Sequence, residues 1–512
     1  MRIKRLLGLQ CWMSHGYLTM LIIVLLALSL GITGCVSSSA SSEASQQRAS
    51  HPAEQQPTPA ATQLSITVTP VLARPIYSPG ELVDYTAQTG DTLPALAAHF
   101  NTTVAEILRA NDFIPESATT MPPGMPMKIP IYYAPFWGSS FQIIPDSLFV
   151  NGPAQLNFDT SAFIAGKPGW LNGYIEYAFG DNRSTAQIVD YVAQQFSVSP
   201  RLLLALLEYQ AGGLTQLAKP AAGVTYVLGN ENYQQEGLYL QLVWAANLLN
   251  NGYYAWRAGS LLTFDTLDER VIRPDPWQNA ATVALQQYFS RLFTGDIYAR
   301  AIAHDGLAQT YAMLFGDPWQ AEVPHIPGSL AQPEFRLPFT SKIAWAYTGG
   351  PHTAYGTGEP FAALDFAPGA SASGCTPSSE WATAVASGVV ARSETGTVLL
   401  DLDGDGDERT GWVVFYFHVA TEGRAVVGQV LEAGDPVGYP SCEGGRTTGT
   451  HIHIARKYNG EWILAGGTLA FNLEGWIAHN GIDAYQGTLT RHSQVITACV
   501  CSDATSQIIA GE

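Results

Sequence analysis

The chain has 512 residues, too many for a single hydrophobic core, so several domains are expected. It carries 25 basic and 43 acidic residues, a formal net charge of −18, which argues against nucleic acid as a partner. Charged residues make up only 13% of the chain, whereas tyrosine, tryptophan, glycine and proline are frequent, a composition compatible with an exported protein.

The N-terminus predicts export. Basic residues near the start precede a mostly apolar run over residues 17–32. The run ends at Cys35 in a segment that resembles a bacterial lipobox, which implies that residues 1–34 are a signal peptide and that Cys35 carries a lipid anchor. A plain transmembrane anchor is the alternative, but the serine-rich sequence after Cys35 favours the lipoprotein. Residues 35–80, poor in large apolar side chains, are predicted to be a flexible tether outside the cytoplasmic membrane.

Residues 83–130 form the first predicted domain. A short strand is followed by two helices that begin near Leu93 and Thr103, and Pro123-Gly124 precedes a closing strand. This stretch resembles a LysM domain, notably at Gly90–Leu93. The resemblance implies a βααβ fold that binds the N-acetylglucosamine chains of peptidoglycan. The alternative interpretation is a structural module without a ligand.

Residues 145–325 are predicted to be mainly helical, with helices expected at 184–196, 201–210, 236–250 and 277–293. The apolar helix that ends at Glu208 distantly resembles the catalytic helix of lysozyme-like transglycosylases, in which a glutamate is the general acid. The residues after Glu208 depart from that family, so a structural helical domain is the favoured interpretation. Prolines between residues 320 and 335 mark a linker to the next domain.

A group of histidines and one aspartate predicts a metal site. His451 and His453 are two positions apart, and a strand would place both side chains on one face. Because imidazole suits zinc and a catalytic zinc keeps three protein ligands, we assign His352, Asp365 and His453 as the ligands. His418 and His451 remain as a general base and a hydrogen-bond donor to the reaction intermediate. A surface strand with solvated histidines is the alternative, and the upstream residues make it less favourable.

The same residues carry a family resemblance. The segments Tyr347–His352, Leu364–Phe366 and Thr448–His453, with His418 after an apolar run, resemble the beta-lytic branch of the lysostaphin/LytM-type zinc endopeptidases. The resemblance covers about residues 335–480 and implies an antiparallel β fold with a narrow groove and peptidoglycan peptides as the substrate. No motif residue is missing, so we expect an active enzyme. The alternatives are a wall-anchored adaptor without activity and a glycan-cleaving enzyme that acts through the glutamate named above.

An acidic loop between two apolar runs is a second candidate metal site. Alternating aspartates and glycines there resemble the first half of a calcium loop, the acidic members being Asp401, Asp403, Asp405 and Asp407. The twelfth position is Trp412 rather than glutamate. Calcium binding and a solvated acidic turn are therefore equally favoured by the sequence.

The remaining cysteines predict disulfides, as an exported chain permits. Cys375 and Cys442 belong to the same predicted domain, and we expect them to pair. Cys499 and Cys501 either pair with each other or pair elsewhere. Soft metal ligation is the alternative, but the assigned site does not need it. Residues 481–512 are predicted to be a polar C-terminal tail. The expected fold class is therefore multidomain α+β: a LysM module, a helical middle domain and an antiparallel β peptidase domain.

Overall fold

The computed structural model describes residues 74–132, 138–369, 374–376, 378–501 and 503–511. The predicted signal peptide, Cys35 and nearly all of the predicted tether lie outside these ranges. No helix within the described ranges has the length and apolar character needed to cross a membrane. The expected multidomain α+β class is confirmed, with a small βααβ module, a helical region and a C-terminal antiparallel sheet.

The LysM module has the predicted strand–helix–helix–strand order. Its elements are β1 (Glu81–Thr86), α1 (Leu93–His99), α2 (Val104–Ala110) and β2 (Pro126–Ile131), with β1 and β2 antiparallel. Thr92 caps α1 through its side chain, and Thr103 forms a reciprocal capping box with Glu106 at the start of α2. The fully buried Leu96, Ile107 and Ile129 tie both helices to the two-stranded sheet.

Serine side chains cap two of the helices in the helical region. Ser184 and Ser199 cap two successive helices, and Pro200 occupies the first position of the second one. The helices are α3 (Thr160–Ala165), α4 (Thr185–Phe196), α5 (Pro200–Ala211), α6 (Leu238–Arg257), α7 (Ala280–Ser290), α8 (Gly295–Ala301) and α9 (Leu307–Phe315). Two short hairpins accompany them, β3 (Ile175–Ala178) with β4 (Asp181–Ser184) and β5 (Phe264–Asp265) with β6 (Val271–Ile272).

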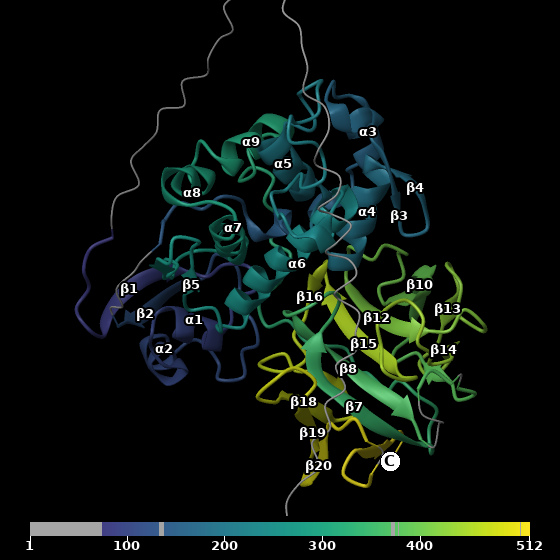
Figure 1. Cartoon of the computed structure of the whole chain (residues 1–512). Helices are drawn as coiled ribbons and strands as arrows, with labels where there is room; N and C mark the ends of the chain where they lie inside the picture. Colours follow the sequence, from purple (N-terminus) through teal and green to yellow (C-terminus); the bar gives the residue numbers. More distant parts are fainter. Residues whose placement is uncertain (1–73, 133–137, 370–373, 377, 502, 512) are drawn as a thin grey trace, which may run out of the picture. The chain divides into compact units, whose positions relative to one another are not determined.

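The C-terminal region is built on one large antiparallel sheet. Its order is β13-β10-β11-β12-β15-β8-β7-β21, and β16 pairs with β15. Figure 1 shows β7, β8, β15 and β12 side by side in the middle of this sheet. The strands are β7 (Ala344–Thr353), β8 (Phe361–Pro368), β9 (Ala382–Thr383), β10 (Gly388–Glu394), β11 (Gly396–Asp401), β12 (Trp412–Val419), β13 (Val430–Leu431), β14 (Pro436–Gly438), β15 (Ile452–Tyr458), β16 (Glu461–Trp462), β17 (Asn472–Leu473), β18 (Trp476–Asn480), β19 (Gly487–Arg491), β20 (Gln494–Thr497) and β21 (Gln507–Ile509).

The two faces of the large sheet contribute to different cores. On one face, side chains such as Leu364, Tyr416 and Ile454 pack in the sheet region's own core. On the other face, Phe415 and Ala455 belong to the same core cluster as the helical region. The helical region therefore packs on the sheet as a continuous structure, because alternate residues of a strand point to opposite faces.

The predicted linker is a packed segment. His325 and Ile326 are buried, and Thr89 and Thr120 of the LysM module hydrogen-bond to this stretch. The backbone amide of Leu330 donates to the Thr120 hydroxyl at 3.0 Å. The sequence indicated a linker because prolines are frequent here, but proline frequency says nothing about what packs over the chain.

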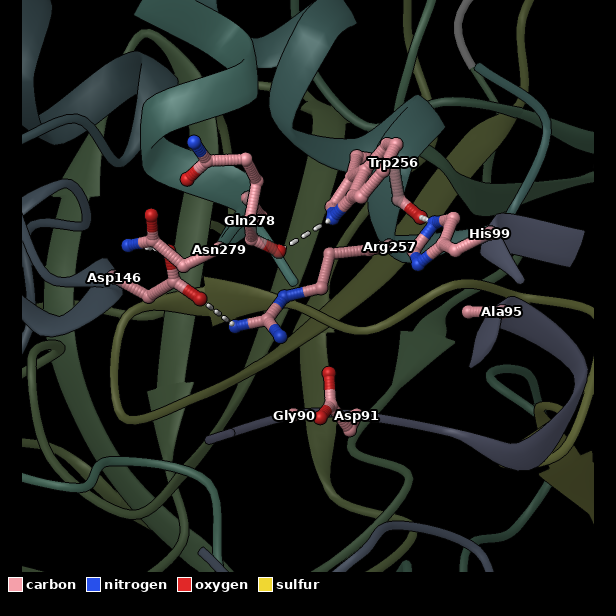
Figure 2. A pocket seen from close by; sticks show the side chains of 10 residues that line it. Gly90, Asp91, Ala95, His99, Asp146, Trp256, Arg257, Gln278 and Asn279 are labelled. Carbon is pink, nitrogen blue, oxygen red and sulfur yellow. Dashed lines mark hydrogen bonds and ion pairs between the residues drawn. The ribbon is translucent and has the colours of Figure 1, made fainter. Parts of the chain in front are cut away.

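A buried arginine lies where the three regions meet. Arg257, the last residue of α6, pairs with Asp146 at 3.0 Å and with Glu461 of β16 at 3.1 Å. It also donates to the carbonyl of Thr89 in the LysM module. Figure 2 shows the guanidinium reaching Asp146, with Asp91 of the LysM module facing it. The space enclosed between Asp91, Asp146 and Arg257 is about 10 Å³, room for about one water molecule. A larger cavity of about 160 Å³ lies next to it, lined by Arg257 and Glu461 among others.

The prediction of a C-terminal tail at residues 481–512 is wrong. β19 and β20 extend a small sheet from β18, and β21 pairs with β7 at the edge of the large sheet. Ile508 of β21 is buried. The strands are too short and too rich in polar residues to show a clear two-residue period, which is why the sequence did not indicate them.

Candidate metal centre

Three side chains meet on adjacent strands of the large sheet. His352 lies on β7, Asp365 on β8 and His453 on β15, and Asp365 stands opposite His453 in the strand register. His352 Nε2 is 3.0 Å from His453 Nδ1 and 3.3 Å from Asp365 Oδ1, and His453 Nδ1 is 3.2 Å from the same oxygen. All three residues are buried. The structure therefore brings the sequence-assigned ligand set to one point.

The outer nitrogen of each of these two imidazoles is held by a backbone carbonyl. His352 Nδ1 lies 2.8 Å from the Gly350 carbonyl, and His453 Nε2 lies 3.0 Å from the Ala354 carbonyl. If those nitrogens carry the protons, Nε2 of His352, Nδ1 of His453 and Oδ1 of Asp365 face one another as lone-pair donors. A shared cation would then relieve the repulsion among the three acceptors, and two imidazoles with one carboxylate are a donor set that zinc takes.

The charges at the centre are compatible with a bound cation. Burial opposes ionisation of Asp365, but His352 and His451 outweigh it and hold the pKa of this carboxyl well below its usual range. Burial also opposes a charge on His352, yet Asp365 raises the pKa of His352. Burial lowers the pKa of His453. The centre thus keeps an ionised carboxylate that attracts positive charge, which a divalent cation would supply.

The other two histidines flank the three donors. His418 on β12 has its Nδ1 2.9 Å from the Glu443 carbonyl, and His451 has its Nδ1 2.8 Å from the Gly449 carbonyl. Their ring centroids are 4.6 Å apart, and His451 Nε2 lies 3.6 Å from Asp365 Oδ1. Burial, together with His451 and His453, lowers the pKa of His418 to about 3. The lowered pKa favours the neutral form of the His418 imidazole.

A disulfide fixes the loop that connects these two histidines. Cys375 and Cys442 are bonded, with their Cα atoms 5.6 Å apart. The residue before Cys442, Ser441, donates its amide to the His418 carbonyl at 2.7 Å and forms an isolated bridge with His451. The covalent link thus restrains the segment that positions both flanking histidines. Cys499 and Cys501 are bonded to each other.

Comparison with known proteins agrees with this arrangement. Residues 142–328 match the family model described as the LasA N-terminal domain, and residues 85–130 match the LysM domain model. Protease LasA from Pseudomonas aeruginosa strain UCBPP-PA14 is 27% identical over 346 residues, covering 63% of this chain and 75% of the relative. Protease LasA from strain PAO1 is 25% identical over 340 residues, with the same coverage. These matches support a zinc metalloendopeptidase, similar to the lysostaphin/LytM type, that carries a LysM domain.

Solved structures of this peptidase class are also similar to parts of the chain. The M23 metalloprotease pseudoalterin, from the deep sea, is 22% identical and covers 33% of this chain and 96% of its own, with a TM-score of 0.28. The catalytic domain of lysostaphin from Staphylococcus simulans is 21% identical and covers 24% of this chain and 87% of its own, with a TM-score of 0.17.

The structure adds an aromatic residue to this metallopeptidase centre that the sequence did not indicate. Tyr485 stacks on the His352 ring with centroids 4.1 Å apart, and its carbonyl accepts the Gly350 amide at 2.8 Å. The sequence placed Tyr485 in the predicted tail. One aromatic residue among polar neighbours carries no signal that would have connected it with a histidine more than a hundred residues earlier.

Glu208, near the end of α5 in the helical region, stabilises a turn. Its carboxylate accepts the amides of Leu214 at 2.7 Å and Thr215 at 3.2 Å, together with the Thr215 hydroxyl. These bonds close the segment after α5. The geometry favours the structural interpretation of Glu208 that the sequence also favoured.

The acidic loop forms a turn that satisfies its most buried carboxylate internally. Asp401 accepts the backbone amides of Asp403, Gly404 and Gly406. Oxygens of Asp401, Asp403 and Asp405 come within 4.8 Å of one another, but the latter two side chains are exposed. Backbone amides thus supply hydrogen bonds to the Asp401 carboxylate within the turn.

Proposed function

We propose that this protein hydrolyses peptide bonds of peptidoglycan at a zinc centre held by His352, Asp365 and His453. The observation that carries the proposal is the meeting of two imidazole nitrogens and one carboxylate oxygen, all buried and within 3.3 Å of one another, beside His418, whose pKa is lowered. A zinc ion bound there would act as a Lewis acid and lower the pKa of water, the chemistry that amide hydrolysis needs.

His418 and His451 are the proton-handling groups in this proposal. His418 keeps Nδ1 at the Glu443 carbonyl, so its Nε2 lone pair can accept a proton from the attacking water and return it to the leaving amine. His451 sits beside it with Nε2 turned toward the centre. This nitrogen would donate a hydrogen bond to the oxyanion that develops on the substrate carbonyl.

The LysM module directs this activity to the cell wall. Binding of N-acetylglucosamine chains by LysM would raise the local concentration of wall peptides around the peptidase, the effect expected when two binding units are joined. Attachment to the membrane through a lipid on Cys35 belongs to the proposal as well, supported by the apolar run and the lipobox-like segment. The protein would then act at the outer face of the cytoplasmic membrane or elsewhere in the cell envelope.

Digestion of purified peptidoglycan by the full chain tests the function. We expect new amino termini with the zinc-loaded wild type and none with a chelator or with Asp365→Ala. The adaptor alternative predicts binding to the wall without new amines. The glycan-cleaving alternative predicts new reducing ends that survive chelation and vanish in Glu208→Gln. Glu208→Gln is the matched control here, because we expect it to retain peptidase activity.

Calcium at the acidic loop stays a prediction from the sequence. Isothermal titration of the chain with calcium, alongside Asp403→Asn with Asp405→Asn, decides it. Heat absent from the double variant but present in the wild type would establish the site. Equal heats of titration for the wild type and the double variant would show that the loop is a solvated acidic turn.

A further inference from the structure

The carbonyl that orients a zinc ligand lies at the start of a loop. His453 Nε2 is 3.0 Å from the carbonyl of Ala354, which follows β7 and begins the connection to β8. This hydrogen bond decides which ring nitrogen of His453 faces the centre. Such partners outside the ligand set fix both the tautomer and the orientation of a metal-binding imidazole. The position of the 354–360 loop therefore matters to the metal centre.

Two asparagines of the helical region hold this loop. On α6, Asn247 accepts the Thr357 amide at 2.7 Å and donates to the Thr357 hydroxyl at 3.0 Å. One turn further on the same helix, Asn251 accepts the Glu359 amide at 2.6 Å. Residues four apart on a helix lie on one face, so both amides reach the same loop. These bonds connect regions separated by more than a hundred residues of sequence.

The loop also fits closely against the helical region. Tyr355 packs edge-on against Phe196 of α4, with ring centroids 5.1 Å apart. Gly358 has a positive φ of 83°, and a Cβ there would collide with the Asn251 amide oxygen. The contact accordingly leaves no room for the loop to shift toward α6, and hydrogen bonds keep it from moving away.

We propose that Asn247 and Asn251 are positioning residues of the zinc centre, so that the helical region completes the metal site of the peptidase domain. They act through the loop: the amides hold its backbone, the loop places the Ala354 carbonyl, and that carbonyl presents His453 Nδ1 to the metal. The inference rests on the proposed zinc centre but concerns metal affinity, which can be measured without any substrate.

The test compares zinc affinity among full-length variants by competition with a chromophoric chelator. The double variant Asn247→Ala with Asn251→Ala should raise the zinc dissociation constant by about tenfold. This is the lower end of the effect seen when a hydrogen-bond partner of a metal ligand is mutated. Asn247→Asp retains an acceptor for both Thr357 groups and should bind zinc as the wild type does. Gln210→Ala is the matched control, since Gln210 bonds only within the helical region among the described contacts, to Leu228 and Tyr288.

A second variant, on the loop side of the contact, keeps the proposal testable if the double alanine variant fails to fold. Thr357→Val removes one bond to Asn247 from the loop side and should weaken zinc binding by a few-fold in a folded chain. Its thermal unfolding should match the wild type without zinc and show a smaller zinc-induced rise in melting temperature. The proposal is overturned if Thr357→Val, or a folded double alanine variant, binds zinc within twofold of the wild type.

Peptidoglycan cleavage in the same samples separates the two proposals. A wild type that binds zinc but cleaves nothing would refute the proposed function, while a tenfold affinity loss in the double variant would still support the positioning role. A wild type that cleaves, with unchanged zinc affinity in the folded variants, would refute the positioning role alone.

Discussion

Asp365 and His453 stand directly opposite each other on β8 and β15, with the carboxylate oxygen 3.2 Å from Nδ1 of the imidazole. Directly opposed residues of an antiparallel pair point to the same face. Strand register alone thus brings together two proposed zinc ligands that are almost ninety residues apart in the sequence. A one-residue slip of β15 would turn His453 to the opposite face and replace it with an isoleucine.

Replacement of the proposed carboxylate ligand, Asp365, should strongly weaken zinc binding. Asp365→Asn keeps the shape of the side chain but removes the charge that attracts the cation. Mutation of a residue that only hydrogen-bonds to a metal ligand typically weakens metal binding by roughly 10–100-fold. We expect the zinc dissociation constant of Asp365→Asn to rise by more than this, and hydrolysis to be lost. Chelator competition measures this, with the exposed Asp296→Asn as control. Unchanged zinc affinity in Asp365→Asn would exclude the assigned ligand set.

Removal of the proposed base should separate chemistry from metal binding. His418→Ala leaves the three ligands in place, so zinc affinity should stay within a few-fold of the wild type. The turnover rate should fall by about 10²–10⁴-fold, as is typical when a general base is lost. Steady-state kinetics on a soluble wall peptide provide the measurement. His479→Ala, on the exposed end of β18, should behave as the wild type; equal rates for both variants would remove His418 from the mechanism.

The buried arginine at the junction of the three regions should be important for stability. Arg257→Met leaves Asp146 and Glu461 buried without their common cation, a loss that typically costs about 3–5 kcal/mol. Arg300→Met removes an exposed pair with Asp305 and should cost about 0–1 kcal/mol. Thermal unfolding of both variants gives the comparison. Equal melting temperatures would show that the junction contributes little.

The LysM module should lose stability as the pH rises past the titration of Asp91. Burial raises the pKa of Asp91 to about 6, against about 3.9 in an unfolded chain. Between about pH 3.9 and about pH 6 the folded state binds this proton more tightly than the unfolded state does. The free energy of unfolding is therefore greatest at the acidic end of this range and decreases as the pH rises toward about 6. The decrease amounts to at most about 3 kcal/mol.

Asp91→Asn tests this dependence because asparagine can still accept the hydrogen bonds from Tyr85 and the Gln88 amide. The wild type should be destabilised relative to the variant at pH 7.5 and should recover at pH 4.5. Thermal unfolding at both values measures the difference, in which all other titrating groups cancel. Parallel pH curves for the two proteins would show that Asp91 titrates normally.

The sequence by itself indicated the LysM module, several helix starts and the histidines and aspartate of the centre. These features depend on local physics: Ser184 and Ser199 cap helices through their own side chains, and His451 and His453 share a face because strands alternate. Such signals act over a few residues and can be read along the chain. The burial of the linker and the strands of residues 481–512 had no comparable local signal.

Tertiary structure alone decided which surfaces meet. That Asn247 and Asn251 hold the loop beside His453, that Tyr485 stacks on His352, and that Arg257 joins three regions all depend on contacts across long sequence separations. None of these residue types is unusual for its position in the sequence. Their roles arise when the sheet buries one face against the helices, because only folding brings a distant side chain within hydrogen-bond reach.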